Sequence, residues 1–214
     1  MGAGPIASVG RPAKFDRSQV QQAALQIVDM YGADALTMRA VANALGTGAM
    51  TLYHHVKDRD DLETLVADAV FADVDLPRPA EDWTVCVEGM SLALWRALRA
   101  HPNTIHFVSS HRGKSPAALD VAEQLLRALE HSGAPAETLV VAFRAILAVI
   151  IGGVEAEPRR LGETDFSKEF AALTGQDGGS RPRLAALTSA AAEMTPEVIF
   201  IGMVRKVING LSSA

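Results

Sequence analysis

The sequence predicts an all-α protein, and three observations support this. Apolar residues recur at the three- and four-residue spacing of amphipathic helices along most of the 214 residues. Asp, Thr, Gly and Pro stand at the ends of these stretches, where they cap or stop helices. No stretch keeps the apolar and polar alternation of a half-buried strand. A chain of this length forms one or two domains and buries a core of its own.

Three helices are expected near the amino terminus, over 17–31, about 37–45 and about 48–55. Asp16 precedes the first helix as an N-cap candidate. The second and third helices are short and are separated by a tight turn that contains Gly46. Two short helices joined in this way form a helix-turn-helix, and the preceding helix completes a three-helix core.

A connecting helix begins after Asp58 and keeps its apolar stripe until the chain meets Pro77 and Pro79. This break is the clearest domain boundary in the sequence. It divides the chain into a disordered basic arm over 1–13, a helix-turn-helix domain with its connecting helix over 14–75 (motif 37–56), and a larger helical domain over 76–214. In the larger domain, helices are expected at about 81–100, 102–110, 116–131, 135–156 and 195–211.

The helices over 135–156 and 195–211 are apolar on most sides, which means that most of their surface must be buried. A chain of this size offers these helices few partners. We therefore predict that they pair with the same helices of a second copy, two from each subunit. The alternative is one large core within a monomer. The predicted interface residues are Val141, Ala145, Val149, Ile201, Val204 and Ile208.

The formal net charge of −5 hides an asymmetry along the chain. Residues 1–57 contain five basic and three acidic residues, a net +2, which leaves −7 for the remainder. A basic amino-terminal module on an acidic body suggests a nucleic-acid partner for that module alone.

Cys86 is the only cysteine, which excludes a disulfide framework and a multi-thiolate metal site. The first ten residues lack the apolar run of a signal peptide. The most apolar stretch, 139–154, is interrupted by Arg144 and is shorter than the roughly 20 residues of a membrane span. The expected protein is therefore cytoplasmic and does not enter a membrane.

The run from Leu36 to Lys57 carries the most specific pattern, LTMRAVANALGTGAMTLYHHVK. It contains a Leu-Thr-x-Arg entry, an Ala-x-x-Leu-Gly turn and a Thr-Leu-Tyr-x-His-Val-Lys end. This run closely resembles the DNA-binding motif of the tetracycline-repressor (TetR) family of bacterial regulators, and the resemblance continues through the helix that follows Asp58. The resemblance implies a sequence-specific transcriptional regulator, a homodimeric repressor that a small-molecule ligand releases from a palindromic double-stranded DNA operator.

The residues of this motif have separable expected roles in binding DNA. Small and apolar groups at the start of the recognition helix can contact a thymine methyl group, whereas a guanidinium can bridge both acceptors of a guanine. The first role falls to Gly48, Ala49 and Met50, and the second to Arg39. The phosphate-facing set implied by the resemblance is Thr51, Tyr53, His55 and Lys57.

Two further groups of residues have a structural alternative beside the DNA-binding role. Thr37 and Thr47 are expected to cap helices and to aim backbone N–H groups at phosphates, or to act as caps alone. Arg11, Lys14 and Arg17 form either a DNA-binding arm or a solvated tail. No cofactor or metal ion is expected, because adjacent histidines such as His54 and His55 point about 100° apart on a helix and have no nearby ligand partner.

The resemblance also implies a ligand pocket among the carboxy-terminal helices, from which a ligand moves the connecting helix. Neither His106 nor His111 falls at the position where tetracycline-binding members place a metal-ligating histidine, which favours a mostly apolar ligand. Each candidate has ordinary packing or exposure as its alternative. The candidates are Trp95, Arg99, His106, Phe107, His111, Phe143, Phe166 and Phe170.

Two other functions compete with a DNA-binding regulator. A helical enzyme or ligand carrier is disfavoured, because Cys86 has no neighbouring base and no Ser, His and carboxylate set shows a recognisable spacing. A helix-turn-helix used only to bind a protein partner would not need the phosphate-facing set.

Overall fold

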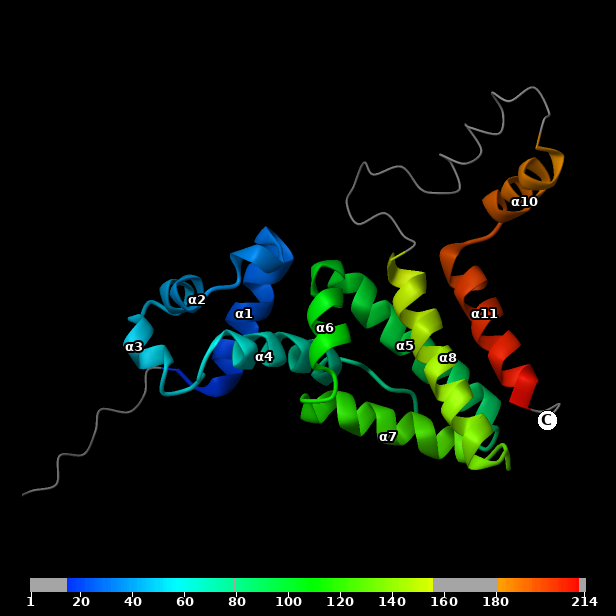
Figure 1. The fold of residues 1–214 in the computed structure, drawn as a ribbon, viewed down its shortest axis with the longest axis horizontal. Helices are drawn as coiled ribbons and strands as arrows, with labels where there is room; N and C mark the ends of the chain where they lie inside the picture. The colour runs from blue at the N-terminus through cyan, green and yellow to red at the C-terminus, as the bar shows by residue number, and fades with distance from the viewer. Residues whose placement is uncertain (1–14, 79, 156–180, 212–214) are drawn as a thin grey trace, which may run out of the picture.

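The structure, a computed structural model, describes residues 15–78, 80–155 and 181–211. Every regular element in these ranges is a helix, which confirms the all-α prediction. Figure 1 shows an elongated arrangement: α1 to α3 lie at one end, α5, α8 and α11 lie towards the other, and α4 and α6 lie between them. The predicted arm over 1–13 lies outside the described residues.

The amino-terminal helices have local sequence causes. Asp16 accepts a hydrogen bond from the Gln19 amide at 2.9 Å, and the Gln19 side chain accepts one from the Asp16 amide at the same distance, which closes a capping box. Gly46, with φ at +62°, makes the tight turn of the helix-turn-helix in a conformation that other residues rarely adopt. The helices are α1 (Arg17–Tyr31), α2 (Met38–Ala44), α3 (Ala49–Leu52) and α4 (Arg59–Ala72).

The carboxy-terminal helices follow the predicted order, with two differences. The helix expected over 102–110 starts as a 3-10 turn, Pro102–Thr104, and becomes α-helical only at Ile105. A helix over Pro182–Ala192 was not predicted, although its proline stands near the first helical position. The helices are α5 (Trp83–Ala100), α6 (Ile105–His111), α7 (Pro116–Glu130), α8 (Ala136–Glu155), α10 (Pro182–Ala192) and α11 (Pro196–Leu211).

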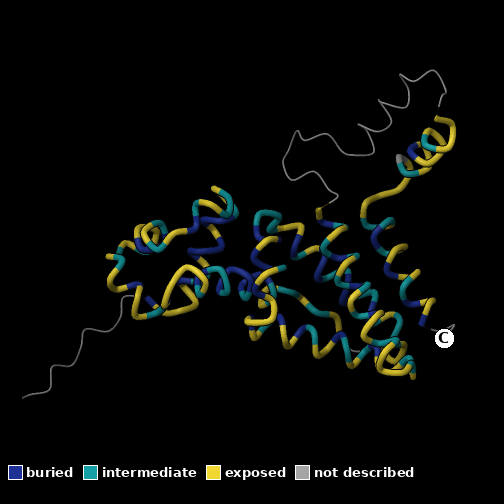
Figure 2. The backbone as a smooth tube through the Cα atoms, viewed as in Figure 1, coloured by how far each residue is buried: buried dark blue, intermediate teal, exposed yellow. Residues whose placement is uncertain are grey.

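The core of the larger part lies where α5, α8 and α11 meet. Trp95 stacks on Phe200, with 4.8 Å between ring centroids and 14° between ring planes. A Cβ atom at Gly153 would lie 3.2 Å from both rings, so the glycine lets α8 approach them. Figure 2 shows the buried residues running along the inner faces of these helices.

Helix α8 is long and apolar enough to cross a membrane by length and composition alone. Its buried residues, including Ile146 and Ile150, pack within the helical core, as expected of a core helix in a folded bundle. Only 22% of its most apolar window is buried inside the subunit, which leaves an apolar face without a partner there.

The position of α11 contradicts part of the predicted dimer interface. Val204 and Ile208 are 0% and 2% exposed, because this face of α11 packs into the core of its own subunit. Their assignment to an intersubunit contact is therefore wrong. Val141 on α8 is 67% exposed, and Ala145, Val149 and Ile201 are half-buried at the edges of the core. The apolar surface left open contains Val141 and Ala148 on α8 and Val198 and Met203 on α11.

Candidate functional site

The helix-turn-helix separates core residues from exposed polar residues. Leu52 and Val56 are fully buried, and so they fix α3 and the segment after it to the three-helix core. Leu36, Val41 and Ala42 of the motif are buried in the same core. The exposed polar or cationic residues of the motif are Thr37, Arg39, Asn43, Thr51, Tyr53, His54 and Lys57.

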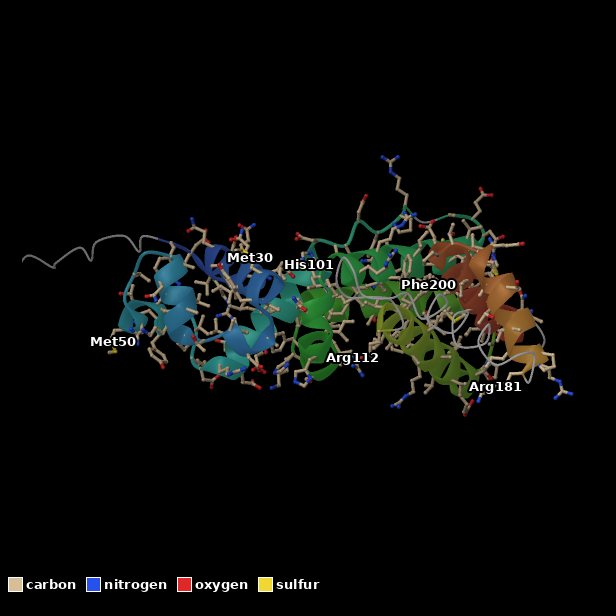
Figure 3. The ribbon with its side chains drawn as sticks, turned by 90° about the horizontal axis from the view of Figure 1, so that it is seen from above. Met30, Met50, His101, Arg112, Arg181 and Phe200 are labelled. Atoms are coloured by element: carbon tan, nitrogen blue, oxygen red, sulfur yellow. The ribbon has the colours of Figure 1, made fainter. Side chains whose placement is uncertain are left out.

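The start of α3 is the most protruding part of the helix-turn-helix. Gly48 is the N-cap residue of α3, Ala49 is half-buried behind it, and Met50 is 79% exposed. Figure 3 shows Met50 at the far end of the described structure. Because the first two residues of this exposed helix start are Gly48 and Ala49, α3 has room to approach base edges in a groove.

Two predicted contact residues have different surroundings from those expected. Thr47 does not cap α3, because Gly48 occupies the cap position and no side chain bonds there. The His55 ring packs on Phe15, with 4.8 Å between ring centroids, so part of its surface is covered. Thr37 does cap α2, through a 3.1 Å bond from the Ala40 amide to its hydroxyl. Arg11 and Lys14 lie outside the described residues.

Asp61 of α4 ties the end of the helix-turn-helix to α1. Its carboxylate accepts hydrogen bonds from Arg17 at 2.7 Å and from the Lys57 amide at 3.1 Å. Burial raises the pKa of this carboxyl, but the bonds from Arg17 and Lys57 outweigh it and hold the pKa below its ordinary value. Arg17 therefore helps to hold α1 against α4, and it is part of the folded helix-turn-helix domain rather than of a loose arm.

Helix α4 is also bonded to the turn between α6 and α7. Asp60 accepts bonds from Lys114 at 2.8 Å and lies 3.1 Å from His111 Nε2. Asp68 accepts bonds from the Ser115 hydroxyl at 2.7 Å and the Ala117 amide at 3.0 Å. Movement of the α6–α7 turn would therefore act directly on α4.

A second set of bonds fastens the end of α1 to the segment between α5 and α6. The Asn103 amide group donates to the carbonyls of Val28 and Asp29 at 3.2 and 3.1 Å. His101 Nδ1 lies 2.8 Å from the Asp29 carboxylate. Figure 3 shows His101 at the junction between the helix-turn-helix end and the remaining helices.

The Asp60 contacts predict a specific pH dependence of stability. The bonds from Lys114 and His111 hold the pKa of Asp60 below its ordinary 3.8. The contribution of Asp60 to folding stability is therefore fully present above pH 3.8 and is lost as the pH falls through the lowered pKa of the folded state. We expect Asp60→Asn to lower the thermal midpoint near pH 6, with the difference from the wild type shrinking as the pH falls below 3.8.

Thermal unfolding monitored by circular dichroism across this pH range measures the effect. Asp75→Asn, at an exposed carboxyl for which the described residues show no bond, is the control and should behave as the wild type does. A deficit of the Asp60 variant that does not shrink as the pH falls below 3.8 would contradict the assignment of these contacts.

A cavity of about 200 Å³ lies among α4, α5, α7 and α8. Phe143 is the one predicted pocket residue that lines it. The apolar lining residues have the spacing of ordinary core positions, so no separate signal marks them as pocket residues. The lining residues are Phe71, Leu94, Arg112, Gly113, Ala118, Leu119, Val121, Ala122, Leu125, Phe143 and Leu147.

The other predicted pocket residues that the structure describes lie elsewhere. Trp95 and Phe107 are each 1% exposed and belong to the core, and the Arg99 guanidinium lies 4.5 Å from the Trp95 ring centroid. His111 is buried against α4 rather than in the cavity. His106 lines a different, polar groove beside Glu155. Phe166 and Phe170 lie outside the described residues.

A further cavity of about 260 Å³ lies between the segment that follows Pro77, α5 and α7, and includes Cys86 and His131. It touches no residue of α4, whereas the 200 Å³ cavity contacts Phe71 of that helix. A ligand in the 200 Å³ cavity therefore has the more direct route to the helix-turn-helix. Among the described residues, no cluster of three His, Cys, Asp or Glu side chains could hold a metal ion.

Comparison with known proteins identifies the family. The profile of bacterial regulatory proteins of the tetR family matches residues 22–62, and that of the tetracyclin repressor-like C-terminal domain matches residues 76–212. The HTH-type transcriptional repressor DrrR1 of Streptomyces coeruleorubidus is 32% identical over 155 residues, which span 69% of this chain and 57% of that protein. A transcriptional regulator of Saccharopolyspora erythraea is 32% identical over 69% of this chain and 66% of its own length.

A structural relative covers nearly the whole chain. ActR from Streptomyces coelicolor superposes with a TM-score of 0.81 at 25% identity, over 95% of this chain and 97% of its own. Another structure of ActR contains (S)-DNPA. The two profile matches together span the helix-turn-helix and the carboxy-terminal helices. The chain therefore belongs to the tetracycline-repressor (TetR) family of bacterial transcriptional regulators.

Proposed function

We propose that the protein is a cytoplasmic, homodimeric transcriptional repressor that binds a palindromic operator and leaves it when a small molecule occupies the 200 Å³ cavity. The exposed polar and cationic face of the helix-turn-helix carries this proposal. The repressor function of DrrR1 supports it. In this proposal residues 14–75 bind DNA, with 1–13 as a basic arm, and residues 76–214 sense the ligand and dimerise.

Helix α3 enters the major groove with its amino-terminal end towards the bases. Gly48, Ala49 and Met50 then contact base edges, and Met50 or Ala49 suits a thymine methyl group. Arg39, exposed on α2, donates to a guanine. The remaining contacts go to phosphates and orient the helix without reading sequence; they come from Thr37, Thr47, Thr51, Tyr53, His55, Lys57, Arg11 and Lys14.

Arg39→Ala tests the base-reading role. If Arg39 bridges a guanine, its loss costs about 1 to 3 kcal/mol on the operator and relaxes the preference at one position in each half-site. Affinities measured by fluorescence anisotropy on single-base operator variants give both quantities. Lys57→Ala is the comparison: it should weaken binding to all sequences about equally and reduce the salt slope by about one. A uniform loss for Arg39→Ala would make it a phosphate contact.

The open apolar faces of α8 and α11 support the dimer. Val141 and Val198 present exposed apolar side chains, and the exposed Gly152 and Gly202 allow close helix approach. Two such helices from each subunit would form a four-helix contact that buries both faces. This arrangement also explains why α8 is apolar beyond the needs of its own subunit.

The route from ligand to DNA runs through α4. The cavity contacts Phe71 of α4 and also Arg112 and Gly113 of the α6–α7 turn, whose neighbour Lys114 bonds to Asp60. A ligand that prefers a shifted turn therefore also prefers a shifted α4 and a changed separation of the two α3 helices. This differential affinity is what release requires.

The operator itself tests the proposal. We expect purified protein to protect a palindrome in the DNA that flanks its own gene, with half-sites about one helical turn or a multiple of it apart. Hydroxyl-radical footprinting measures the spacing. Protection of a single half-site, or of no preferred sequence, would contradict the proposed dimeric repressor.

A further inference from the structure

One of the described residues that line the 200 Å³ cavity is charged. All its other described lining residues are apolar or glycine. Arg112 belongs to the turn after α6 and lines the cavity together with Gly113. Figure 3 shows Arg112 at the outer edge of the molecule in that view. The cavity is therefore an apolar space with a cation at its rim.

The Arg112 guanidinium has spare hydrogen-bonding capacity. Its Nη1 donates to the Ser109 carbonyl at 2.6 Å, and no carboxylate among the described residues pairs with it. Five other described arginines are paired with acids at 2.7 to 3.2 Å: Arg17 with Asp61, Arg59 with Glu63, Arg96 with Glu197, Arg127 with Glu123 and Arg205 with Glu88. A guanidinium has five N–H donors, so Arg112 retains several for another acceptor.

The charges around Arg112 favour an anion at this rim. Among the residues that the structure describes, no acidic side chain lines the cavity. Asp60 of α4 already accepts hydrogen bonds from Lys114 and lies 3.1 Å from His111. A carboxylate that reached the rim would therefore meet an available guanidinium with no competing acid among the described wall residues, and the two groups can form paired, charge-assisted hydrogen bonds.

Resting on the proposed function, we infer that the effector is a small organic acid whose apolar body fills the cavity and whose carboxylate pairs with Arg112. The volume equals that of roughly seven water molecules, which limits the body to a small ring system or a medium-length alkyl chain. Arg112 then selects for the anion, and the apolar wall selects for the body. The bound anion lies beside Lys114, whose bond to Asp60 connects the turn to α4.

Matched neutral and anionic probes test this inference. The probes are straight-chain carboxylic acids of about six to twelve carbons, each compared with its primary amide of nearly the same shape, in titration calorimetry with the full chain. We expect the best acid to bind about five- to tenfold more tightly than its amide, because an exposed charge-assisted pair contributes modestly. Arg112→Gln should remove this advantage and leave the amide affinity unchanged.

Two variants serve as controls. Arg127→Gln removes another exposed arginine, one that lies outside this cavity, and should keep the preference for acids. Leu119→Trp, at a partly exposed lining position, should obstruct the cavity and weaken acid and amide alike. Thermal midpoints of all variants show whether they are folded.

Equal affinity for acid and amide, a preference that survives Arg112→Gln, or no saturable binding of either series would overturn the inference. Operator binding by the same protein without probes is measured in parallel. If that binding is present, the repressor function stands whatever the probes show; if it is absent, the proposed function fails independently of Arg112.

Discussion

A negative charge at Val141 should convert the protein from dimer to monomer and weaken operator binding by about 100-fold or more. Val141 is 67% exposed on α8, so Val141→Asp leaves the core of the subunit intact. In the proposed four-helix contact the same position is buried against a second copy, where an unpaired carboxylate is costly. Each monomer would then bind only one half-site. In the dimer, binding of one helix-turn-helix gives the linked second one a high effective concentration at its own half-site, and the monomer lacks this advantage.

Sedimentation velocity measures the mass, and anisotropy on the palindrome measures the affinity. Val85→Asp is the matched control: Val85 is 56% exposed on α5, outside the two faces assigned to the dimer. The control should remain a dimer and bind the operator as the wild type does. A Val141→Asp variant that sediments as a dimer would place the subunit interface elsewhere.

Replacing Trp95 with alanine should destabilise the subunit by about 3 to 5 kcal/mol, the cost of removing a large buried aromatic side chain. Trp95 is 1% exposed, stacks on Phe200 and lies against Gly153. At this chain length the loss corresponds to a fall of about 6 to 20 °C in the thermal midpoint.

Trp83→Ala provides the comparison for this prediction, since Trp83 is half-buried beside the 260 Å³ cavity and loses fewer contacts. Denaturant unfolding of both variants, followed by circular dichroism, gives the two free energies. Equal losses at Trp83 and Trp95 would contradict the assignment of Trp95 to the core and would reopen its role as a ligand contact.

Sequence reasoning worked where the cause of a structure lies within a few residues of it. The capping side chain of Asp16, the left-handed turn at Gly46 and the helix start after Asp58 all depend on neighbours three or four positions away. The bounds of α1, α5, α7 and α8 consequently match the prediction to within two residues. The helix-turn-helix was readable for the same reason.

Sequence reasoning failed where a residue's surroundings come from a distant segment. Because α11 is apolar on most sides, periodicity does not show which of its faces packs into the core of the subunit. Val204 and Ile208 lie on that core face and not on the predicted dimer face. His111 meets Asp60 across 51 positions of sequence, so nothing near it indicates a contact with α4. Arg112 was missed because a charged residue in a turn is usually a solvated one.

The most direct test of the account is the affinity of the protein for its palindromic operator across a salt series. We predict a dissociation constant of about 10⁻⁸ M or tighter at physiological salt, and a scrambled duplex bound at least about 1,000-fold more weakly. With six to ten phosphate contacts, affinity should fall by about 10³ to 10⁵ between 50 and 200 mM salt. Equal affinity for operator and scrambled DNA, or an affinity that does not change with salt, would contradict it.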